Sequence, residues 1–452
     1  MTSYQNDQNM AKRLAERVRA KGGTAYYVGG YVRDRLLGIE NKDIDIEIHG
    51  VGAESLAEIL DGLGERQAFG ESFGIFSLKG YGLDIALPRK EKAIGKGHRD
   101  FETFTDPHIG TYGAAKRRDF TVGALMMDVL TGEITDHFGG VRDLKDGVLR
   151  HVCTETFTED PLRVLRLAQF AARFDFTAAE ETLALCRTVT LSHLSRERVW
   201  EELRKGMLKA KKPSVFFEVL RSADRLCEWF PELEALIGVE QDPLHHAEGD
   251  AFRHTMMVLD EAAKYREKVS DPFSFMLAAL CHDFGKAICT RRVDGRIRSL
   301  HHETEGLVPV ERFLRRLTNE TKRIGYVLNL TEQHMRPNAL AAFGSSVKAT
   351  NKMFDSVQVP RDLYYLARAD YFGKISGEGS SFCEEFLLER LQIYETIMKK
   401  PHVLGRDLTE AGLVPGPYFS ELLAYAHKLR LAGVEKEEAL KQTLGYARRI
   451  KQ

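Results

Sequence analysis

Short apolar runs interrupted by glycine turns are the dominant pattern in the first part of the chain. Residues 25–28 form an apolar run, residues 29–30 are Gly-Gly, residues 32–34 favour a helix, and residues 43–47 alternate between acidic and apolar positions. An apolar run bounded by glycines is typical of a strand, and strict alternation is typical of a strand with one buried face. The pattern predicts a strand, a glycine turn, a helix and a second strand, in this order.

A change in composition divides the chain near residue 145. Up to about residue 140, glycine is frequent and short apolar strands mix with helices, which is typical of an α/β arrangement. Beyond it, glycine becomes rarer and helical periodicity takes over. We therefore predict an α+β protein, in which an α/β head with a mixed sheet at residues 1–143 precedes all-α regions at residues 144–215, 216–400 and 401–452. Residues 412–417 predict a rigid turn between two helices of the last region.

Composition limits the class of protein. The chain has 452 residues, of which 43% are hydrophobic and 29% charged, and this predicts a soluble protein with more than one core. No stretch approaches the roughly 20 apolar residues of a membrane span, and the polar N-terminal residues lack the apolar segment of a secretory signal, so we expect a cytoplasmic protein without a membrane partner. Six scattered cysteines indicate neither a disulfide framework nor a zinc ribbon. The net charge of −1 neither supports nor excludes RNA binding.

The first candidate site lies in the glycine turn and the strand that follows it. Gly29 and Gly30 allow the backbone to approach a ligand closely at the start of a helix, where phosphates bind. Asp43 and Asp45 are two residues apart in a strand, so their carboxylates lie on the same side and repel each other unless a cation lies between them. Magnesium, which prefers carboxylates and substrate phosphates, meets that requirement. Taken alone, either half is more often an ordinary strand-to-helix turn or a solvated acidic run.

The two halves together carry a family resemblance. GGYVRD followed by DID resembles the signature of the class II tRNA nucleotidyltransferase and bacterial poly(A) polymerase family, the CCA-adding enzymes. The resemblance implies that Gly29, Gly30 and Arg33 hold the nucleotide triphosphate. It also implies that Asp43 and Asp45 are catalytic and carry Mg²⁺.

Two further segments belong to the predicted head. Asp84 is the single carboxylate of an apolar strand at residues 82–87 and would complete a catalytic site with three carboxylates, although a lone strand aspartate is also common at turns and edges. Residues 89–107 are polar and lack clear periodicity, which predicts a long loop. In the resembling family, the equivalent region is a flexible loop that is needed for addition of the final adenosine.

Arg117, Arg118 and Asp119 form the next nucleotide-binding candidates. Arginine forks match phosphate oxygens and a carboxylate accepts from a sugar hydroxyl, although a surface cluster of ion pairs has the same composition. The segment resembles the family motif RRDFT-x-N-A with one departure, because Gly123 stands at the usual Asn position. The departure leaves the local geometry of the nucleotide site open.

Asp160 and Arg163 are candidates for selecting the base. An aspartate accepts from the amino group of cytosine or adenine and an arginine donates to the adjacent ring nitrogen, whereas guanine and uracil would leave buried groups unpaired at a cost of roughly 1–3 kcal/mol each. The commoner meaning of such a pair is a salt bridge at a helix start. The string EDPLR resembles the family motif E-D-x-x-R, and Arg166 one turn further is assigned with them to nucleotide binding. Residues 196–203 resemble the helix that closes this region.

Histidines and aspartates spread over residues 240–400 indicate a second chemistry. An adjacent His-Asp pair follows an apolar helix, where burial without a ligand would be costly. The arrangement resembles the HD phosphohydrolase superfamily and implies a divalent metal, namely manganese, nickel, iron or magnesium. The implied ligands are His254, His282, Asp283 and Asp370, with His302 and His334 as further ligands if the site is binuclear.

These motifs predict an enzyme that adds CMP and AMP from CTP and ATP to the 3′ end of tRNA, with two-metal nucleotidyl transfer and release of pyrophosphate. An A-adding enzyme or a poly(A) polymerase would use the same motifs. A metal-dependent HD phosphohydrolase with a degenerate head and a silent RNA-binding scaffold are alternatives from other classes. The oligomeric state is left open.

Overall fold

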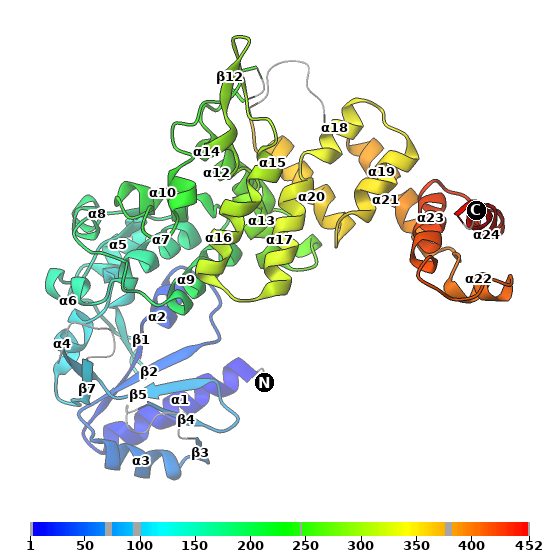
Figure 1. Cartoon of the computed structure of the whole chain (residues 1–452). Helices are drawn as coiled ribbons and strands as arrows, with labels where there is room; N and C mark the ends of the chain where they lie inside the picture. The colour runs from blue at the N-terminus through cyan, green and yellow to red at the C-terminus, as the bar shows by residue number, and fades with distance from the viewer. Residues whose placement is uncertain (1–2, 68–74, 94–100, 245, 376–381, 451–452) are drawn as a thin grey trace. The chain divides into compact units, whose positions relative to one another are not determined.

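The computed structural model describes residues 3–67, 75–93, 101–244, 246–375 and 382–450. The chain forms two compact units (Figure 1). The first comprises Met1–Ala210 and Val215–Trp229, and the second comprises Lys211–Ser214 and Phe230–Gln452. Among the described residues, no helix has the length and apolar character that crossing a membrane requires.

The first unit contains a mixed seven-stranded sheet in the order β3-β4-β5-β2-β1-β8-β9. Only β2 and β5 pair in parallel, and the other neighbours pair antiparallel. The strands of this sheet are β1 (Thr24–Val28), β2 (Ile44–His49), β3 (Arg66–Gln67), β4 (Ile75–Leu78), β5 (Leu83–Ala86), β8 (Met126–Asp128) and β9 (Ile134–Thr135). The mixed sheet predicted for the head is confirmed.

The helices of the head pack around this sheet. They are α1 (Ser3–Ala20), α2 (Gly30–Leu36), α3 (Ala53–Asp61), α4 (Gly110–Lys116), the 3₁₀ turn η2 (Thr121–Gly123) and α5 (Gly140–Asp146). Helix α1 contacts β1, β2 and α3. Its buried residues recur with helical spacing at Met10, Leu14 and Val18, so one apolar stripe attaches it to the sheet.

The long loop predicted at residues 89–107 is wrong over much of its length. Strands β6 (Arg89–Ala93) and β7 (Phe101–Thr105) form an antiparallel ribbon with five paired positions, and residues 94–100 lie outside the described residues. Sequence reasoning finds strands through alternating apolar positions, and β6 has the sequence RKEKA with a single apolar residue. The sequence of β6 therefore contains no recognisable strand pattern.

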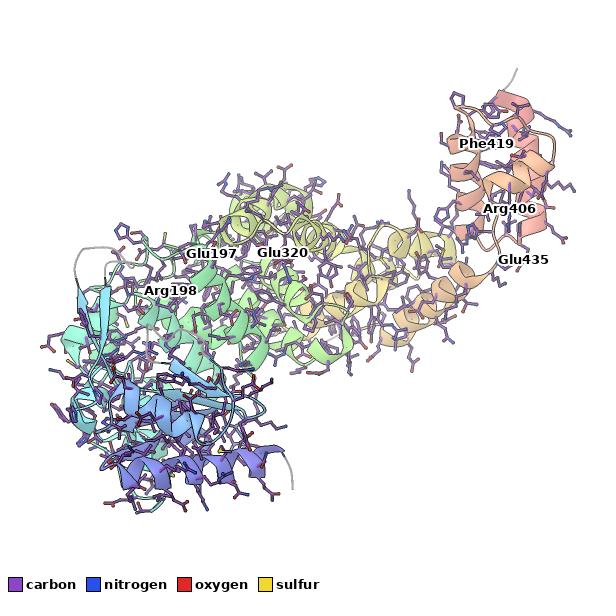
Figure 2. All side chains as sticks on the ribbon, turned by 90° about the horizontal axis from the view of Figure 1, so that it is seen from below. Glu197, Arg198, Glu320, Arg406, Phe419 and Glu435 are labelled. Carbon is purple, nitrogen blue, oxygen red and sulfur yellow. The ribbon has the colours of Figure 1, made fainter. Side chains whose placement is uncertain are left out.

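Helices follow the head, as predicted. Up to residue 222 they are α6 (Thr154–Glu159), α7 (Leu162–Phe174), α8 (Glu180–Cys186), α9 (Arg196–Lys209) and α10 (Ser214–Ser222), with the short parallel pair β10 (Val148–Leu149) and β11 (Thr177–Ala178). Helix α7 packs along α9. Glu197 and Arg198 lie in the first turn of α9 (Figure 2).

The second unit is almost entirely helical. Its elements up to residue 400 are α11 (Pro231–Glu234), α12 (Ala251–Ala263), η3 (Arg266–Lys268), α13 (Pro272–Cys281), α14 (Lys286–Cys289), β12 (Arg291–Val293), β13 (Arg296–Arg298), α15 (His302–Glu305), α16 (Leu307–Leu317), α17 (Thr321–Gln333), α18 (Arg336–Ala342), α19 (Val347–Asp355), α20 (Pro360–Phe372) and α21 (Glu384–Lys399). Helix α13 is buried from Phe273 to Cys281 and packs against α12, α17 and α20. The Asp271 side chain caps it by accepting from the N–H groups of Phe273 and Ser274.

The tail helices have their own apolar cluster. They are α22 (Gly405–Glu410), α23 (Phe419–Leu431) and α24 (Lys436–Ile450), and residues 412–417 connect the first two as predicted. Leu408, Leu422 and Ala439 are buried between them. Arg406, Phe419 and Glu435 mark this region in Figure 2. The four-part division at residues 143, 215 and 400 stays a prediction.

Candidate functional site

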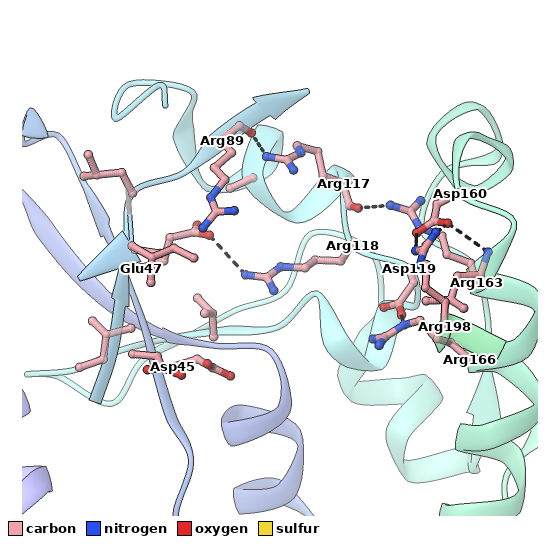
Figure 3. Close-up of a pocket in the computed structure, with 18 residues that line it drawn as sticks. Asp45, Glu47, Arg89, Arg117, Arg118, Asp119, Asp160, Arg163, Arg166 and Arg198 are labelled. Atoms are coloured by element: carbon pink, nitrogen blue, oxygen red, sulfur yellow. Dashed lines mark hydrogen bonds and ion pairs between the residues drawn. The ribbon is translucent and has the colours of Figure 1, made fainter. Parts of the chain in front are cut away.

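A pocket of about 640 Å³ lies in the first unit where the sheet meets α7 and α9 (Figure 3). Eight of the predicted site residues line it, namely Asp45, Asp84, Arg117, Arg118, Asp119, Asp160, Arg163 and Arg166. Three charged residues that sequence reasoning did not assign also line it, namely Glu47, Arg89 and Arg198. Its size suits a nucleotide.

The sheet side of the pocket carries the carboxylates. Asp45 on β2 lies directly opposite Asp84 on β5 in the parallel register, so both side chains lie on the same face. Burial raises the pKa of Asp45 to about 6, and the negative charges of Asp84 and Asp43 add to the rise. Asp43 is exposed one residue before β2 and does not line the pocket. A divalent cation would relieve this crowding, so the residues present fit one.

Gly29 lies beside these carboxylates. Its φ of +63° is in the region that favours glycine. A Cβ at this position would lie 3.5 Å from Arg118 Nη1 and 3.9 Å from Asp45 Oδ2. The glycine therefore allows the turn and keeps the backbone open to the site, while Gly30 begins α2.

Arg33 is placed away from the pocket. Its side chain is buried, with Nε donating to Asp34 Oδ1 at 2.8 Å and Nη2 2.6 Å from the same oxygen. Its guanidinium lies 4.4 Å from the ring centre of Phe174 and 5.3 Å from that of Phe170. In this arrangement Arg33 attaches α2 to α7 and does not reach the carboxylate edge.

The arginines at positions 117 and 118 are held by different partners. Arg118 Nη2 donates to Glu47 Oε2 at 3.3 Å, and the other Glu47 oxygen is 2.9 Å from His49 Nε2. Arg117 Nη1 donates to the carbonyl oxygen of Arg89. Both guanidinium groups thus lie between the carboxylate edge and the helical wall, where a triphosphate would fit (Figure 3).

Asp119 is joined to α7. Arg166 Nε donates to Asp119 Oδ2 at 2.6 Å, while the N–H of Phe120 donates to Oδ1 at 2.9 Å. Although burial opposes ionisation, the Arg166 ion pair holds the pKa of Asp119 below its ordinary value. A Cβ at Gly123 would lie 3.6 Å from Asp119 Oδ1, which is an ordinary contact. The backbone at Gly123 therefore has room for a side chain, and the glycine is not required by sterics.

Asp160 and Arg163 do not form the salt bridge that was the commoner interpretation of their spacing. Arg163 donates from Nη1 to the carbonyl oxygen of Thr156 at 2.5 Å and from Nη2 to that of Arg117 at 2.8 Å. Arg198 Nη2 lies 3.0 and 2.8 Å from the two carboxylate oxygens of Asp160. The carboxylate keeps further lone pairs, so a base amino group can also donate to it.

The second unit holds a separate pocket of about 520 Å³. The six residues predicted from the His-Asp pattern come together beside it from five parts of the chain, and four of them line it, namely Asp283, His302, His334 and Asp370. His254 lies in α12, His282 and Asp283 follow α13, His302 begins α15, His334 follows α17, and Asp370 lies in α20. Apart from the partly exposed Asp370, all of them are buried.

Every histidine of this group has its Nδ1 turned to an oxygen. His282, His302 and His334 donate to the carbonyl oxygens of Ala279, Ser299 and Thr331 at 2.8, 2.7 and 2.6 Å. His254 Nδ1 is 3.0 Å from Glu248 Oε1. Since a carbonyl oxygen only accepts, Nδ1 carries the proton and Nε2 presents a lone pair in the neutral ring. Burial and the adjacent His282 and His302 lower the pKa of His334 to about 3, which keeps that ring neutral.

The Nε2 atoms form two groups around Asp283. Oδ2 is 3.1 Å from His282 Nε2 and 3.4 Å from His254 Nε2, on the side where Asp370 also lies. Oδ1 is 3.1 Å from His302 Nε2 and 3.8 Å from His334 Nε2. Converging lone pairs and carboxylates are what a metal requires, and the two groups offer three ligand atoms each.

Glu248 is a member of this cluster that sequence reasoning missed. It is buried, and its Oε1 accepts from His246 at 2.8 Å as well as lying against His254. Carboxylates in this position orient a metal-binding histidine and fix its tautomer. The only sequence signal was an acidic residue six positions before His254.

Comparisons with known proteins agree with the pocket of the first unit. The family described as Poly A polymerase head domain matches residues 25–150, and the family described as probable RNA and SrmB-binding site of polymerase A matches residues 175–237. The "Multifunctional CCA protein" of Stenotrophomonas maltophilia is 36% identical over 418 residues, which cover 90% of this chain and 98% of that protein. That of Chromobacterium violaceum is 42% identical over 297 residues, covering 65% of this chain and 69% of that protein.

The chain belongs to the family of CCA-adding tRNA nucleotidyltransferases. A solved structure described as Thermotoga maritima CCA-adding enzyme complexed with tRNA_CCA has the same fold, with a TM-score of 0.66 and 22% identity over 97% of this chain and 95% of that chain. As a nucleotidyltransferase, the chain belongs to a family that uses divalent metal. Both matched family regions end before the second pocket, which begins at Gln241.

Proposed function

We propose that this nucleotidyltransferase adds CMP and AMP from CTP and ATP to the 3′ end of tRNA without a template. One pocket joins the Asp45–Asp84 edge, the arginines at 117 and 118, and the Asp160–Arg163 helix start, and this juxtaposition carries the proposal. The names of the relatives, and the tRNA bound to the Thermotoga maritima enzyme, support it. We propose a cytoplasmic location for the same reason, since tRNA is the substrate.

The residues divide the reaction between them. Arg117 and Arg118 would hold the triphosphate, and the tRNA 3′-hydroxyl would attack the α-phosphorus in line as the bond to pyrophosphate breaks. Asp43, Asp45 and Asp84 would hold Mg²⁺, which supplies charge neutralisation for the attacking and leaving oxygens. In the folded protein, Asp43 is exposed directly before β2 and two residues from Asp45.

Base selection would take place at the helix start. Asp160 accepts from the amino group of cytosine or adenine, and Arg163 donates to the neighbouring ring nitrogen. Arg198 contacts both oxygens of the Asp160 carboxylate and would keep it oriented before the base arrives. Because both bases offer the same donor and acceptor order, one pair can serve both steps.

Sequencing of the products tests this function. A tRNA lacking its three terminal nucleotides, incubated with CTP and ATP, should end in CCA. Incorporation of adenosine alone would assign an A-adding enzyme or a poly(A) polymerase. Binding of tRNA with no incorporation would contradict the proposal.

The second pocket supports a second function, the metal-dependent hydrolysis of a phosphoester. Two groups of ligands on either side of Asp283 support a binuclear centre, in which His254, His282 and Asp370 would hold one ion and Asp283, His302 and His334 the other. Manganese, nickel, iron and magnesium all suit imidazole and carboxylate ligands. A metal would activate water for attack on phosphorus.

Metal content and hydrolysis of p-nitrophenyl phosphate test this centre. We expect two ions per chain in the wild type, and one in His302→Ala, because this substitution removes a ligand from one group only. His282→Ala should lose the ion of the other group. Hydrolysis should then fall by roughly 10²-fold or more, since the loss of residues that only orient a metal ligand already lowers activity by about 10- to 100-fold. Zero bound ions in the wild type, or hydrolysis that survives in both variants, would contradict a binuclear phosphohydrolase.

A further inference from the structure

A hairpin rich in arginine stands beside the second pocket. Strands β12 and β13 pair antiparallel around Asp294 and Gly295, whose φ values of 51° and 76° are those of a tight two-residue turn (Figure 1). All of residues 291–298 are exposed except the half-buried Ile297. The hairpin therefore contributes little to the core of its unit, and a role in folding does not explain its charges.

The register places three arginines on one face. Arg291 lies opposite Arg298, and Val293 lies opposite Arg296, so these four residues share a face, while Arg292 and Ile297 lie on the other. Like charges directly opposite each other destabilise a strand pair. Arg291 and Arg298 therefore repel each other in the folded protein, and an anionic ligand bound on that face would remove this repulsion.

The arginines of this face have no acidic partner among the residues that the structure describes. The Arg296 and Arg298 side chains make neither an ion pair nor a hydrogen bond with any residue in the described ranges, and Arg291 donates only to the carbonyl oxygen of Thr290. On the opposite face, Arg292 pairs with Glu240 at 2.7 Å. The unbalanced positive charge is thus confined to one side of the hairpin.

The hairpin reaches the pocket of the metal-ligand cluster through β13. Arg296 and Arg298 line the same 520 Å³ pocket as Asp283, His302 and His334. Leu300 and Met335, which are 57% and 43% exposed, also line it and offer apolar surface for a sugar or base. The two lysines of the pocket are engaged, Lys286 with Asp283 at 2.6 Å and Lys374 with the ring of Tyr371.

We propose that the face formed by Arg291, Arg296 and Arg298, the arginine arm, binds the phosphodiester backbone of a single-stranded nucleic acid whose terminal phosphate enters the metal pocket. The proposal rests on the phosphohydrolase function proposed above and specifies a polymeric substrate for it. Arginine forks match phosphate oxygens, and Arg296 and Arg298 are about 6.8 Å apart along the strand. A phosphate at the metal ligands cannot also occupy positions along the hairpin, so the arm requires a ligand with further phosphates.

The test compares one small and one polymeric phosphate monoester. The substrates are p-nitrophenyl phosphate and a ten-nucleotide oligouridylate with a 3′-phosphate, which also blocks extension by the nucleotidyltransferase site. In Arg296→Gln/Arg298→Gln, we expect kcat/KM to fall by about 10-fold or more on the oligonucleotide at 0.15 M salt and to stay within about twofold on the small ester. The slope of log kcat/KM against log salt should become shallower by about 1.4 on the oligonucleotide, since each lost phosphate contact contributes about 0.7 for a single strand.

The control is Arg292→Gln/Arg315→Gln, which removes the same charge and leaves the arm intact. Arg315 pairs with Glu311 on α16, and Arg292 lies on the other face of the hairpin. An equal loss of kcat/KM on both substrates would show that the arginines contact the reacting phosphate itself. An equal loss of kcat/KM in the control variant would show that the effect comes from net charge alone. Either result overturns the proposal.

A binding measurement separates the arm from the phosphohydrolase activity. Metal-free wild-type chain is photocross-linked to oligouridylate that carries 4-thiouridine near a 3′-phosphate, and the modified peptides are mapped by mass spectrometry. Cross-links within residues 291–300 that disappear in Arg296→Gln/Arg298→Gln support the arm even if neither ester is hydrolysed. Their absence, or their suppression by polyglutamate as effectively as by unlabelled oligouridylate, overturns it.

Discussion

Replacement of Asp45 by Asn is expected to lower the transfer of both CMP and AMP by roughly 10³-fold or more, because a metal site of this kind contributes several kcal/mol of charge stabilisation. The loss should affect both nucleotides equally, since the proposed role of the carboxylate edge is to hold metal and does not involve the base. Single-nucleotide incorporation into tRNA lacking its terminal residues measures it. Asp61→Asn, at the end of α3 and paired with Arg66, is the matched control and should transfer normally. Normal transfer by the Asp45 variant would overturn the assignment of the site.

The same substitution should not weaken the fold. Burial raises the pKa of Asp45 to about 6, above the roughly 3.9 of an unfolded chain, so ionisation costs the folded state stability as pH rises between these values. In metal-free buffer above about pH 6, Asp45→Asn should unfold at the same or a higher temperature than the wild type. Below about pH 4 the carboxyl is protonated in both states and the difference should vanish. A variant that unfolds early at pH 7.5 would attribute lost activity to lost structure.

Local spacing predicted much of the carboxylate edge and little of what surrounds it. Alternation places Asp43 and Asp45 on one face, and Glu47 continues the same alternation, so it could have been found. The position of Asp84 opposite Asp45 depends on which strands are neighbours, and β2 and β5 are separated by α3, β3 and β4 in the chain. For Arg33, the sequence motif was recognisable but did not predict where the side chain points. Its contacts with Asp34 and Phe174 decide that direction.

In the second pocket, residue types indicated which side chains lie together even though those residues are far apart in the sequence. His254 and Asp370 are predicted together because the pattern resembles the HD phosphohydrolase superfamily. His254 Nε2 and Asp370 Oδ1 lie 3.2 Å apart, although α13 to α19 separate the two residues in the chain. Glu248 carried no such signal, because an acidic residue near a helix start is ordinary. The role of Asp283 between two groups of histidines depends on the packing of α13, α15 and α17, which no spacing specifies.

Replacement of Asp160 by Ala should remove most of the preference for CTP and ATP over UTP and GTP. In the base recognition proposed here, Asp160 supplies the acceptor for the amino group of cytosine or adenine. A mismatched base would leave buried groups unpaired at roughly 1–3 kcal/mol each, so two such groups account for about 10²-fold or more. We expect kcat/KM for CTP and ATP to fall by about that factor and the values for UTP and GTP to change little. Incorporation assays with each nucleotide alone measure the four values.

Arg198 determines how this result is interpreted. It contacts both Asp160 oxygens, so the alanine variant also leaves a guanidinium without that partner, and some loss could follow from its movement. In Arg198→Met the carboxylate remains and only its support is removed, so the preference for cytosine and adenine should persist while KM rises for both. Glu180→Ala removes an exposed carboxylate that is paired with Arg187 and does not line the pocket, so it controls for the loss of a carboxylate as such. If Asp160 recognises the base, it should still discriminate between bases when Arg198 is replaced. A loss of base preference in Arg198→Met as complete as that in Asp160→Ala would therefore reverse the roles, with the arginine recognising the base and the aspartate supporting it.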